Sequence, residues 1–195
     1  MQNYVILHQK QYYMKFSTTA LEGVWLIEPL RHHDERGYFC ETFRSDLFEA
    51  ATGIKPSFVQ ENESLSGRNV VRGLHYQAGS AAQAKLVRVS EGAIVDVAVD
   101  LRVGSPTYGR HICVELSADN ARQLYIPRGF AHGFAVISDF ARFQYKTDNY
   151  YCPQAERTLR PDDETVAVRW PVARECMILS PKDMAGCSWL ECEKF

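Results

Sequence analysis

Short segments of alternating apolar and polar residues recur along the chain, separated by Gly, Pro, Asn and Ser. We expect strands over residues 23–29, 38–43, 57–64, 70–77, 84–90, 93–101, 111–116, 123–126, 134–137 and 141–147. Because turn signals recur about every ten residues, this spacing predicts an all-β sandwich or closed barrel.

Helical periodicity is scarce. Leu47, Phe48 and Ala51 predict one short helix over residues 45–51, with Ser45 as its N-cap. After Tyr150 the chain has four prolines, which predict loops with a few short helices. With no repeat or linker in view, residues 14–195 are expected to form a single domain, and residues 1–13 a flexible N-terminal arm.

Three polar residues alternate with apolar ones in the middle of expected strands. Lys85 shares a strand face with two valines, Asp96 lies between two apolar neighbours on its face, and Tyr145 shares its face with Phe143. Because burying an unpaired charge is costly, such groups should meet partners inside the barrel or line a cavity. The pattern therefore predicts a polar-lined barrel mouth.

The composition excludes several broad functions. Of the 195 residues, 46% are hydrophobic and 24% are charged, as in ordinary globular proteins, and the formal net charge is −2. This charge balance offers no broad basic surface for nucleic acid or anionic membranes. We expect no membrane span and no signal peptide, a cytoplasmic location, and reduced thiols for the six cysteines, with Cys113 as a small buried side chain.

The densest candidate motif is Arg72-Gly73-Leu74-His75 within the strand expected over 70–77. Strict alternation would place Arg72 and His75 on opposite faces of the sheet. A bulge at Gly73 would instead turn both side chains inward, because glycine within a strand often marks a bulge. The alternative is that His75 is a satisfied core histidine and Arg72 an outward-facing charge.

A second motif, Pro127-x-Gly129-x-x-His132, resembles the second sequence motif of cupins, which are small double-sheet β-barrels. Many cupins bind a metal, and His132 is either a ligand-binding residue or one that stabilises the turn. Gln77 occupies the place where the first cupin motif normally supplies its second histidine. Because a metal needs several converging ligands, we expect no metal site, and a metal-dependent cupin enzyme remains an alternative.

Several motifs in order connect the chain to one family. Residues 72–77, 84–89, 96–100, 105–109, 127–134, 145–146 and 179–183 together resemble the dTDP-4-dehydrorhamnose 3,5-epimerase family, from about Met14 to Asp183. The resemblance implies a cupin fold, a double-stranded β-helix or jelly-roll barrel. It also implies a homodimer without metal or cofactor that acts on a dTDP-linked 4-keto-6-deoxyhexose. The implied reaction inverts C3 and C5 of a 4-keto-6-deoxy-D-glucose to give the 4-keto-L-rhamnose form.

The resemblance also implies roles for individual side chains. His75 matches the base that removes a proton beside the ketone, and Asp183 matches the carboxylate that pairs with it. Tyr145 matches the residue that returns a proton from the opposite face, and Lys85 the residue that stabilises the enolate oxygen. These roles suit the residues' own chemistry, because imidazole is a base near neutral pH and a positioned ammonium stabilises an oxyanion.

Further positions match those that contact substrate in the family: Arg36, Glu41, Gln60, Asn62, Arg72, His132, Glu156 and Lys182. In the family an N-terminal strand crosses to the partner subunit, so Arg36 and Glu41 would serve the neighbouring site. Asp96 is expected either to form an ion pair with Lys85 or His75, or to orient the base. Tyr150 either stacks on the nucleobase or packs against the protein.

One segment departs from the family pattern. After Glu156 the family usually carries Gly, a hydrophobic residue and Trp-Asn-Asp, whereas this chain has Arg157 to Asp163 with a proline at position 161. Because proline restricts the residue before it, this loop must follow another path. The departure leaves open a mono-epimerase acting at C3 or C5 alone. A regulatory sugar-nucleotide binding module is a further alternative.

Overall fold

The computed structural model describes residues 4–5 and 14–195. Most of the expected N-terminal arm, residues 1–13, lies outside the described residues. Within it, β1 (Tyr4–Val5) pairs antiparallel with β2 (Met14–Thr18).

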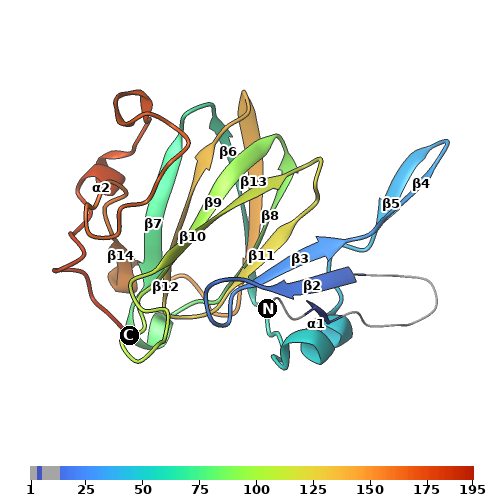
Figure 1. The fold of residues 1–195 in the computed structure, drawn as a ribbon, viewed down its shortest axis with the longest axis horizontal. Helices are drawn as coiled ribbons and strands as arrows, with labels where there is room; N and C mark the ends of the chain where they lie inside the picture. The colour runs from blue at the N-terminus through green and yellow to red at the C-terminus, as the bar shows by residue number, and fades with distance from the viewer. Residues whose placement is uncertain (1–3, 6–13) are drawn as a thin grey trace.

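The described strands form two large sheets and a separate hairpin (Figure 1). The seven-stranded sheet has the order β1, β2, β3 (Trp25–Pro29), β11 (Gln123–Ile126), β8 (Lys85–Glu91), β13 (Phe140–Thr147) and β6 (Gln60–Gly67). The five-stranded sheet has the order β10 (His111–Ser117), β9 (Ala93–Asp100), β12 (Phe130–Val136), β7 (Val71–Gln77) and β14 (Glu156–Thr158). The hairpin consists of β4 (Arg31–Asp34) and β5 (Gly37–Cys40), and it projects away from the sheets.

Helices are short and lie at the margins. Helix α1 (Ser45–Thr52) packs against the seven-stranded sheet through Phe48, and α2 (Pro181–Met184) lies beside β7 in the C-terminal segment (Figure 1). Short 3₁₀ turns span Gly79–Ala81, Pro153–Ala155 and Arg174–Cys176. No helix among residues 14–195 is long and apolar enough to cross a membrane.

The main core lies between the two sheets. Val87 and Val89 from β8 meet Ile94 and Ala98 from β9, together with Phe134 from β12, and all are at most 5% exposed. Because side chains alternate along a strand, these core positions leave Lys85 and Asp96 on the same inward faces. The predicted all-β double-sheet barrel of the jelly-roll type, with short helices in the C-terminal segment, is therefore confirmed.

The predicted boundaries fail where strand pairing outweighs local signals. Strand β12 begins at Phe130, not at residue 134, because the segment after Gly129 pairs with β9 on one side and β7 on the other. The prediction missed β1, β2, β4 and β14 and placed β6 three residues too early. Ser45 is the first residue of α1 and not its cap, since the N-cap is Arg44. Cys113 is exposed, because β10 is an edge strand whose other face packs on the core.

Candidate active site

Of the two alternatives for Gly73, the structure has the bulge in β7. His75 pairs with His132 across the sheet and Arg72 pairs with Phe134, so two β7 residues, Gly73 and Leu74, face one residue of β12. Gly73 has φ of +122°, and a Cβ there would lie 2.6 Å from the Cα of Gly133. The position therefore requires glycine. As a result, Arg72 and His75 line the same cavity.

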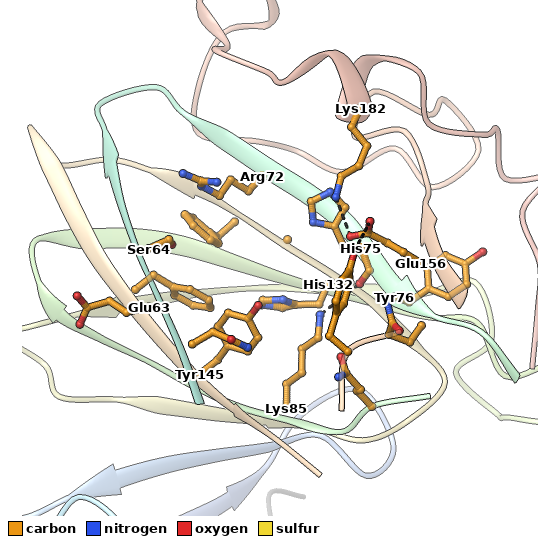
Figure 2. A pocket seen from close by; sticks show the side chains of 17 residues that line it. Glu63, Ser64, Arg72, His75, Tyr76, Lys85, His132, Tyr145, Glu156 and Lys182 are labelled. Atoms are coloured by element: carbon orange, nitrogen blue, oxygen red, sulfur yellow. Dashed lines mark hydrogen bonds and ion pairs between the residues drawn. The ribbon is translucent and has the colours of Figure 1, made fainter. Parts of the chain in front are cut away.

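That cavity opens between the two sheets and has a volume of about 410 Å³ (Figure 2). His75 enters from β7, Lys85 from β8 and Tyr145 from β13. Figure 2 shows Tyr145 and His75 on different sides of the view, with the Lys85 side chain reaching into the space between them. The cavity, which is partly open to solvent, joins a base, a cation and a phenol in one space, and this suits ligand binding.

His75 is held by a buried carboxylate. Its Nε2 lies 2.5 Å from Oδ1 of Asp183, which is 3% exposed, and Ser180 donates from Oγ to the other carboxylate oxygen at 2.7 Å. Burial favours the neutral acid, but the hydrogen bonds from His75 and Ser180 outweigh it and hold the pKa of Asp183 below its ordinary value. An imidazole fixed in this way keeps one tautomer and is stabilised when it gains a proton.

The Lys85 ammonium lies within the same cavity. Its Nζ is 3.4 Å from the carbonyl oxygen of His75 and 5.9 Å from the centre of the Tyr145 ring. Desolvation lowers the pKa of Lys85 to about 8, although Asp96 and Glu156 act in the opposite direction. The group therefore stays mostly protonated at neutral pH and is close to its titration range.

Tyr145 faces the cavity from the seven-stranded sheet, which also carries Lys85, whereas His75 belongs to the five-stranded sheet. Burial raises the pKa of its phenol, and a hydrogen bond with Asn62 partly offsets this effect. Tyr145 and Asn62 are cross-strand partners on β13 and β6, so the pairing of these strands positions both side chains. A phenol that keeps its proton is a suitable acid.

Asp96 pairs with neither of its expected partners. Its Oδ2 lies 2.9 Å from Nε2 of His132, and within residues 14–195 no hydrogen bond or ion pair joins it to Lys85 or His75, so the expectation that it bonds one of these was wrong. Because Asp96 is fully buried and His132 is 5% exposed, the pair lies in the wall of the cavity. His132 therefore acts as a wall residue of the cavity, at the position where the sequence allowed either a ligand-binding or a structural role.

The structure brings some of the expected substrate-binding residues together. Arg72, Asn62, Glu156 and Lys182 line the cavity, and Lys182 Nζ lies 2.7 Å from Oε1 of Glu156. Gln60 is not a lining residue, but its Nε2 donates to the Asn62 side chain at 2.9 Å.

Arg36 and Glu41 do not line the cavity of their own chain. Arg36 lies at the tip of the β4–β5 hairpin with its side chain 86% exposed, and it pairs with Asp34 of the same turn. Glu41 follows the end of β5 and faces Arg44 at 3.9 Å. The roles expected for these two residues depend on a partner subunit and stay predictions.

Of the adjacent residues Tyr150 and Tyr151, Tyr151 is the one that lines the cavity. Tyr150 is 67% exposed and is absent from the cavity lining, whereas Tyr151 lines the cavity and donates its hydroxyl to Glu156 at 3.0 Å. Sequence reasoning also missed Gln83 and Ser64, which line the cavity. The alternation along β6 places Ser64 on the same face as Asn62, and this signal could have identified it.

The segment that departs from the family pattern leaves the cavity after Glu156. Leu159 is fully buried and exchanges backbone hydrogen bonds with Leu74 at 2.9 and 3.0 Å, so the chain is tied to the bulge in β7. Beyond it, Arg160 binds Asp162 outside the cavity lining. Pro161 and its neighbours therefore lie outside the cavity lining, to which β14 contributes Glu156.

In the part of the chain that the structure describes, the side chains that could bind a metal do not converge. Within residues 4–5 and 14–195, no group of three or more His, Cys, Asp or Glu side chains is arranged to hold a metal ion.

Comparisons with known proteins identify the family of this chain. The sequence profile described as dTDP-4-dehydrorhamnose 3,5-epimerase matches residues 18–191. The chain is 51% identical over 170 residues to the dTDP-4-dehydrorhamnose 3,5-epimerase of Escherichia coli (strain K12), covering 87% of this chain and 91% of that protein. It is 40% identical to the dTDP-4-dehydrorhamnose 3-epimerase of Streptomyces niveus, covering 87% and 81%.

A solved structure gives the same result in three dimensions. The dTDP-6-deoxy-D-glucose-3,5-epimerase of Legionella pneumophila, solved in complex with dTDP-4-keto-L-rhamnose, superposes with a TM-score of 0.86 at 41% identity. The match covers 99% of this chain and 95% of that one. The chain therefore belongs to the dTDP-4-dehydrorhamnose 3,5-epimerase family.

Proposed function

We propose that this protein epimerises C3 and C5 of a dTDP-4-keto-6-deoxy-D-glucose-type substrate, giving the 4-keto-L-rhamnose form. The observation that carries the proposal is the convergence of His75, Lys85 and Tyr145 on one cavity, with His75 backed by the buried Asp183. Family membership supports the same reaction and a nucleotide-linked sugar as substrate.

The chemistry follows from the position of the ketone. C3 and C5 both adjoin the C4 carbonyl, so loss of a proton from either carbon gives an enolate with its charge on the same oxygen. His75 takes the proton, and Asp183 stabilises the resulting imidazolium. The Lys85 ammonium stabilises the enolate oxygen, and it does so at both steps because that oxygen does not change. Tyr145 returns a proton from the other face of the ring, which inverts the centre.

Solvent deuterium incorporation tests this proposal. The purified protein is incubated with the 4-keto sugar nucleotide in D₂O. Proton NMR then follows the loss of the signals from the hydrogens on C3 and C5. We expect label at both carbons and no label with His75→Ala. Absence of exchange by the wild-type protein would refute the activity.

A mono-epimerase is the second candidate. The observation that favours it is the similarity to a 3-epimerase, together with the departure from the family pattern at residues 157–163. Label at only one carbon in the same experiment would support this second function.

We also propose that the active form is a homodimer in which the β4–β5 hairpin enters the partner's cavity. The hairpin projects from the body of the chain (Figure 1), and its Tyr38 and Phe39 are 57% and 62% exposed. Exposed aromatic side chains favour burial against another surface. Arg36, at the tip of the hairpin, would then supply a guanidinium for the substrate diphosphate of the neighbouring site.

Subunit complementation tests this arrangement. Arg36→Ala and His75→Ala chains, each weakly active or inactive alone, are mixed, dissociated and reassociated. If the hairpin acts in the partner, each mixed dimer contains one site with both wild-type residues, and activity returns. If activity does not return, Arg36 does not act across the interface.

A further inference from the structure

A second histidine–carboxylate pair lies next to the first in the five-stranded sheet. His132 and His75 are cross-strand partners on β12 and β7, and each contacts its own buried aspartate, Asp96 or Asp183. Unlike Asp183, Asp96 holds a histidine that is itself almost completely buried. The proposed reaction does not use this second pair, although His132 lines the cavity.

The pairing decides which nitrogen of His132 carries the proton. A carboxylate only accepts hydrogen bonds, so the proton of the imidazole lies on Nε2, which points at Asp96 Oδ2. Burial lowers the pKa of His132, which keeps the ring neutral at pH 7. Its Nδ1 then carries a lone pair, and the hydrogen bond to Asp96 through Nε2 is the one that the His132 ring forms among residues 14–195. Such an atom accepts a hydrogen bond from a hydroxyl group and does not bind a phosphate oxygen.

The other carboxylate oxygen is unusual. Asp96 Oδ1 is buried and has no hydrogen-bond partner within the described part of the chain. A buried oxygen of this kind is expensive unless its charge interacts with a nearby cation. Among the charges that act on the half-buried Lys85, Asp96 contributes most to keeping it protonated.

The charged and titratable groups around Lys85 come from six elements: His75 on β7, Asp96 on β9, His132 on β12, Tyr145 on β13, Glu156 on β14 and Lys182 on α2. Two of them are carboxylates. Glu156 is already paired with Lys182, whose own charge opposes protonation of Lys85. The negative charge that remains for Lys85 is therefore mainly that of Asp96.

We propose that Asp96 is a positioning residue of the epimerase site. It keeps His132 in the tautomer whose Nδ1 accepts a hydrogen bond from a hydroxyl of the bound sugar, and it supplies the charge that keeps Lys85 an ammonium. Asp96 does not line the cavity, so it acts through these two residues. The inference rests on the proposed function, because an ammonium is needed only if an enolate oxygen forms beside it.

Asp96→Asn separates the two roles. The amide oxygen still accepts from His132 Nε2, so the tautomer is retained while the charge is lost. Asp96→Leu removes both. Asp100→Asn is the matched control, because Asp100 is also a fully buried aspartate of β9 but binds Arg102, Ser105 and Thr107 away from the cavity.

The kinetic readout is the pH profile of kcat. Since Lys85 must be protonated, activity falls as the pH rises through its pKa. Loss of a neighbouring negative charge favours the neutral amine, so Asp96→Asn should move this alkaline limb to lower pH by about one unit. Asp100→Asn should leave the limb where it is. An unchanged limb in Asp96→Asn would overturn the charge role.

Nuclear magnetic resonance gives a test that needs no turnover. With ¹⁵N-labelled histidine, wild-type His132 should carry its proton on Nε2, and Asp96→Leu should give a mixture of tautomers. With ¹³C-labelled lysine, the Lys85 signal, assigned by its loss in Lys85→Arg, should titrate at lower pH in Asp96→Asn. A wild-type His132 protonated on Nδ1, or an unmoved Lys85 titration, would overturn the inference even if the protein proves to be an epimerase. If these signals behave as expected but no deuterium enters the substrate, the proposed function fails and the electrostatic assignment stands.

Discussion

Replacing Gly73 with alanine tests whether the bulge in β7 builds the active site. The added Cβ would lie 2.6 Å from the Cα of Gly133 and 2.8 Å from the carbonyl oxygen of His132. Both contacts are with backbone atoms, which cannot rotate away as a side chain would. The substitution must therefore move β7 and β12 apart at the point where His75 and His132 face each other.

The expected loss of stability has two parts. An alanine at a positive φ costs about 1–2 kcal/mol, because its Cβ approaches the backbone. Forcing the extra carbon into a closely packed site adds about 1–3 kcal/mol. Gly37→Ala isolates the first part, because Gly37 has φ of +124° and an alanine Cβ there would meet nothing within 4 Å. Gly73→Ala should thus lower the free energy of unfolding by about 1–3 kcal/mol more than Gly37→Ala.

Urea unfolding at one fixed protein concentration measures this difference, because any association would make stability depend on concentration. Deuterium exchange into the substrate measures the effect on chemistry, and Gly73→Ala should lower its rate by displacing His75. Gly53→Ala, at the left-handed C-cap of α1, is the control for activity, because it lies away from the cavity. If Gly73→Ala matches Gly37→Ala in stability and Gly53→Ala in activity, the bulge does not have the role assigned to it.

Three further outcomes follow from the site and the core. Asp183→Asn should lower kcat by about 10²–10⁴-fold in steady-state assays, because it removes the group that stabilises the imidazolium. Asp163→Asn, which alters a buried carboxylate that caps a loop, should leave kcat near the wild-type value. Tyr145→Phe should slow net epimerisation, followed by NMR, more than it slows proton removal. Burial acts to raise the pKa of Asp100, but its hydrogen bonds, first among them that from Arg102, lower it to about 2. Ionised Asp100 therefore stabilises the folded protein by roughly 2 kcal/mol above pH 4, and this contribution is lost as the pH falls toward 2. Asp100→Asn should abolish this acid dependence of the free energy of unfolding in urea titrations.

Each of these outcomes has a clear opposite. An Asp183→Asn enzyme with wild-type kcat would show that the carboxylate does not assist the base. Equal rates of epimerisation in Tyr145→Phe and the wild type would remove the phenol from the reaction. If Asp100→Asn keeps the acid dependence of the wild type, other carboxylates are responsible for it.

Local alternation was enough to place several site residues on the correct faces. The period of two along β8 and β13 puts Lys85 and Tyr145 on the same side as core valines and Phe143, and the structure confirms both placements. The glycine in β7 likewise indicated where a bulge could turn Arg72 and His75 into the cavity, and the structure has that bulge. These inferences succeed because the direction of a side chain depends on the few residues next to it.

Boundaries and partners were less predictable. Strand β14 is three residues long and carries no local β signal, since its existence depends on pairing with β7. Alternation also could not distinguish Tyr150 from Tyr151, because the segment after β13 is a loop without a fixed period. In the same way, the sequence did not indicate that the exposed face of edge strand β10 would carry Cys113.

The sequence by itself determined the fold class, the inward faces and the residues capable of acid–base chemistry. Only the tertiary structure decided which of these residues meet. Asp183 reaches His75 across 108 positions of the chain, and Asp96 pairs with His132, not with Lys85 or His75. The physical reason is that side-chain direction is set by local backbone geometry, whereas contact between distant strands depends on sheet order and register, which many weak interactions fix together.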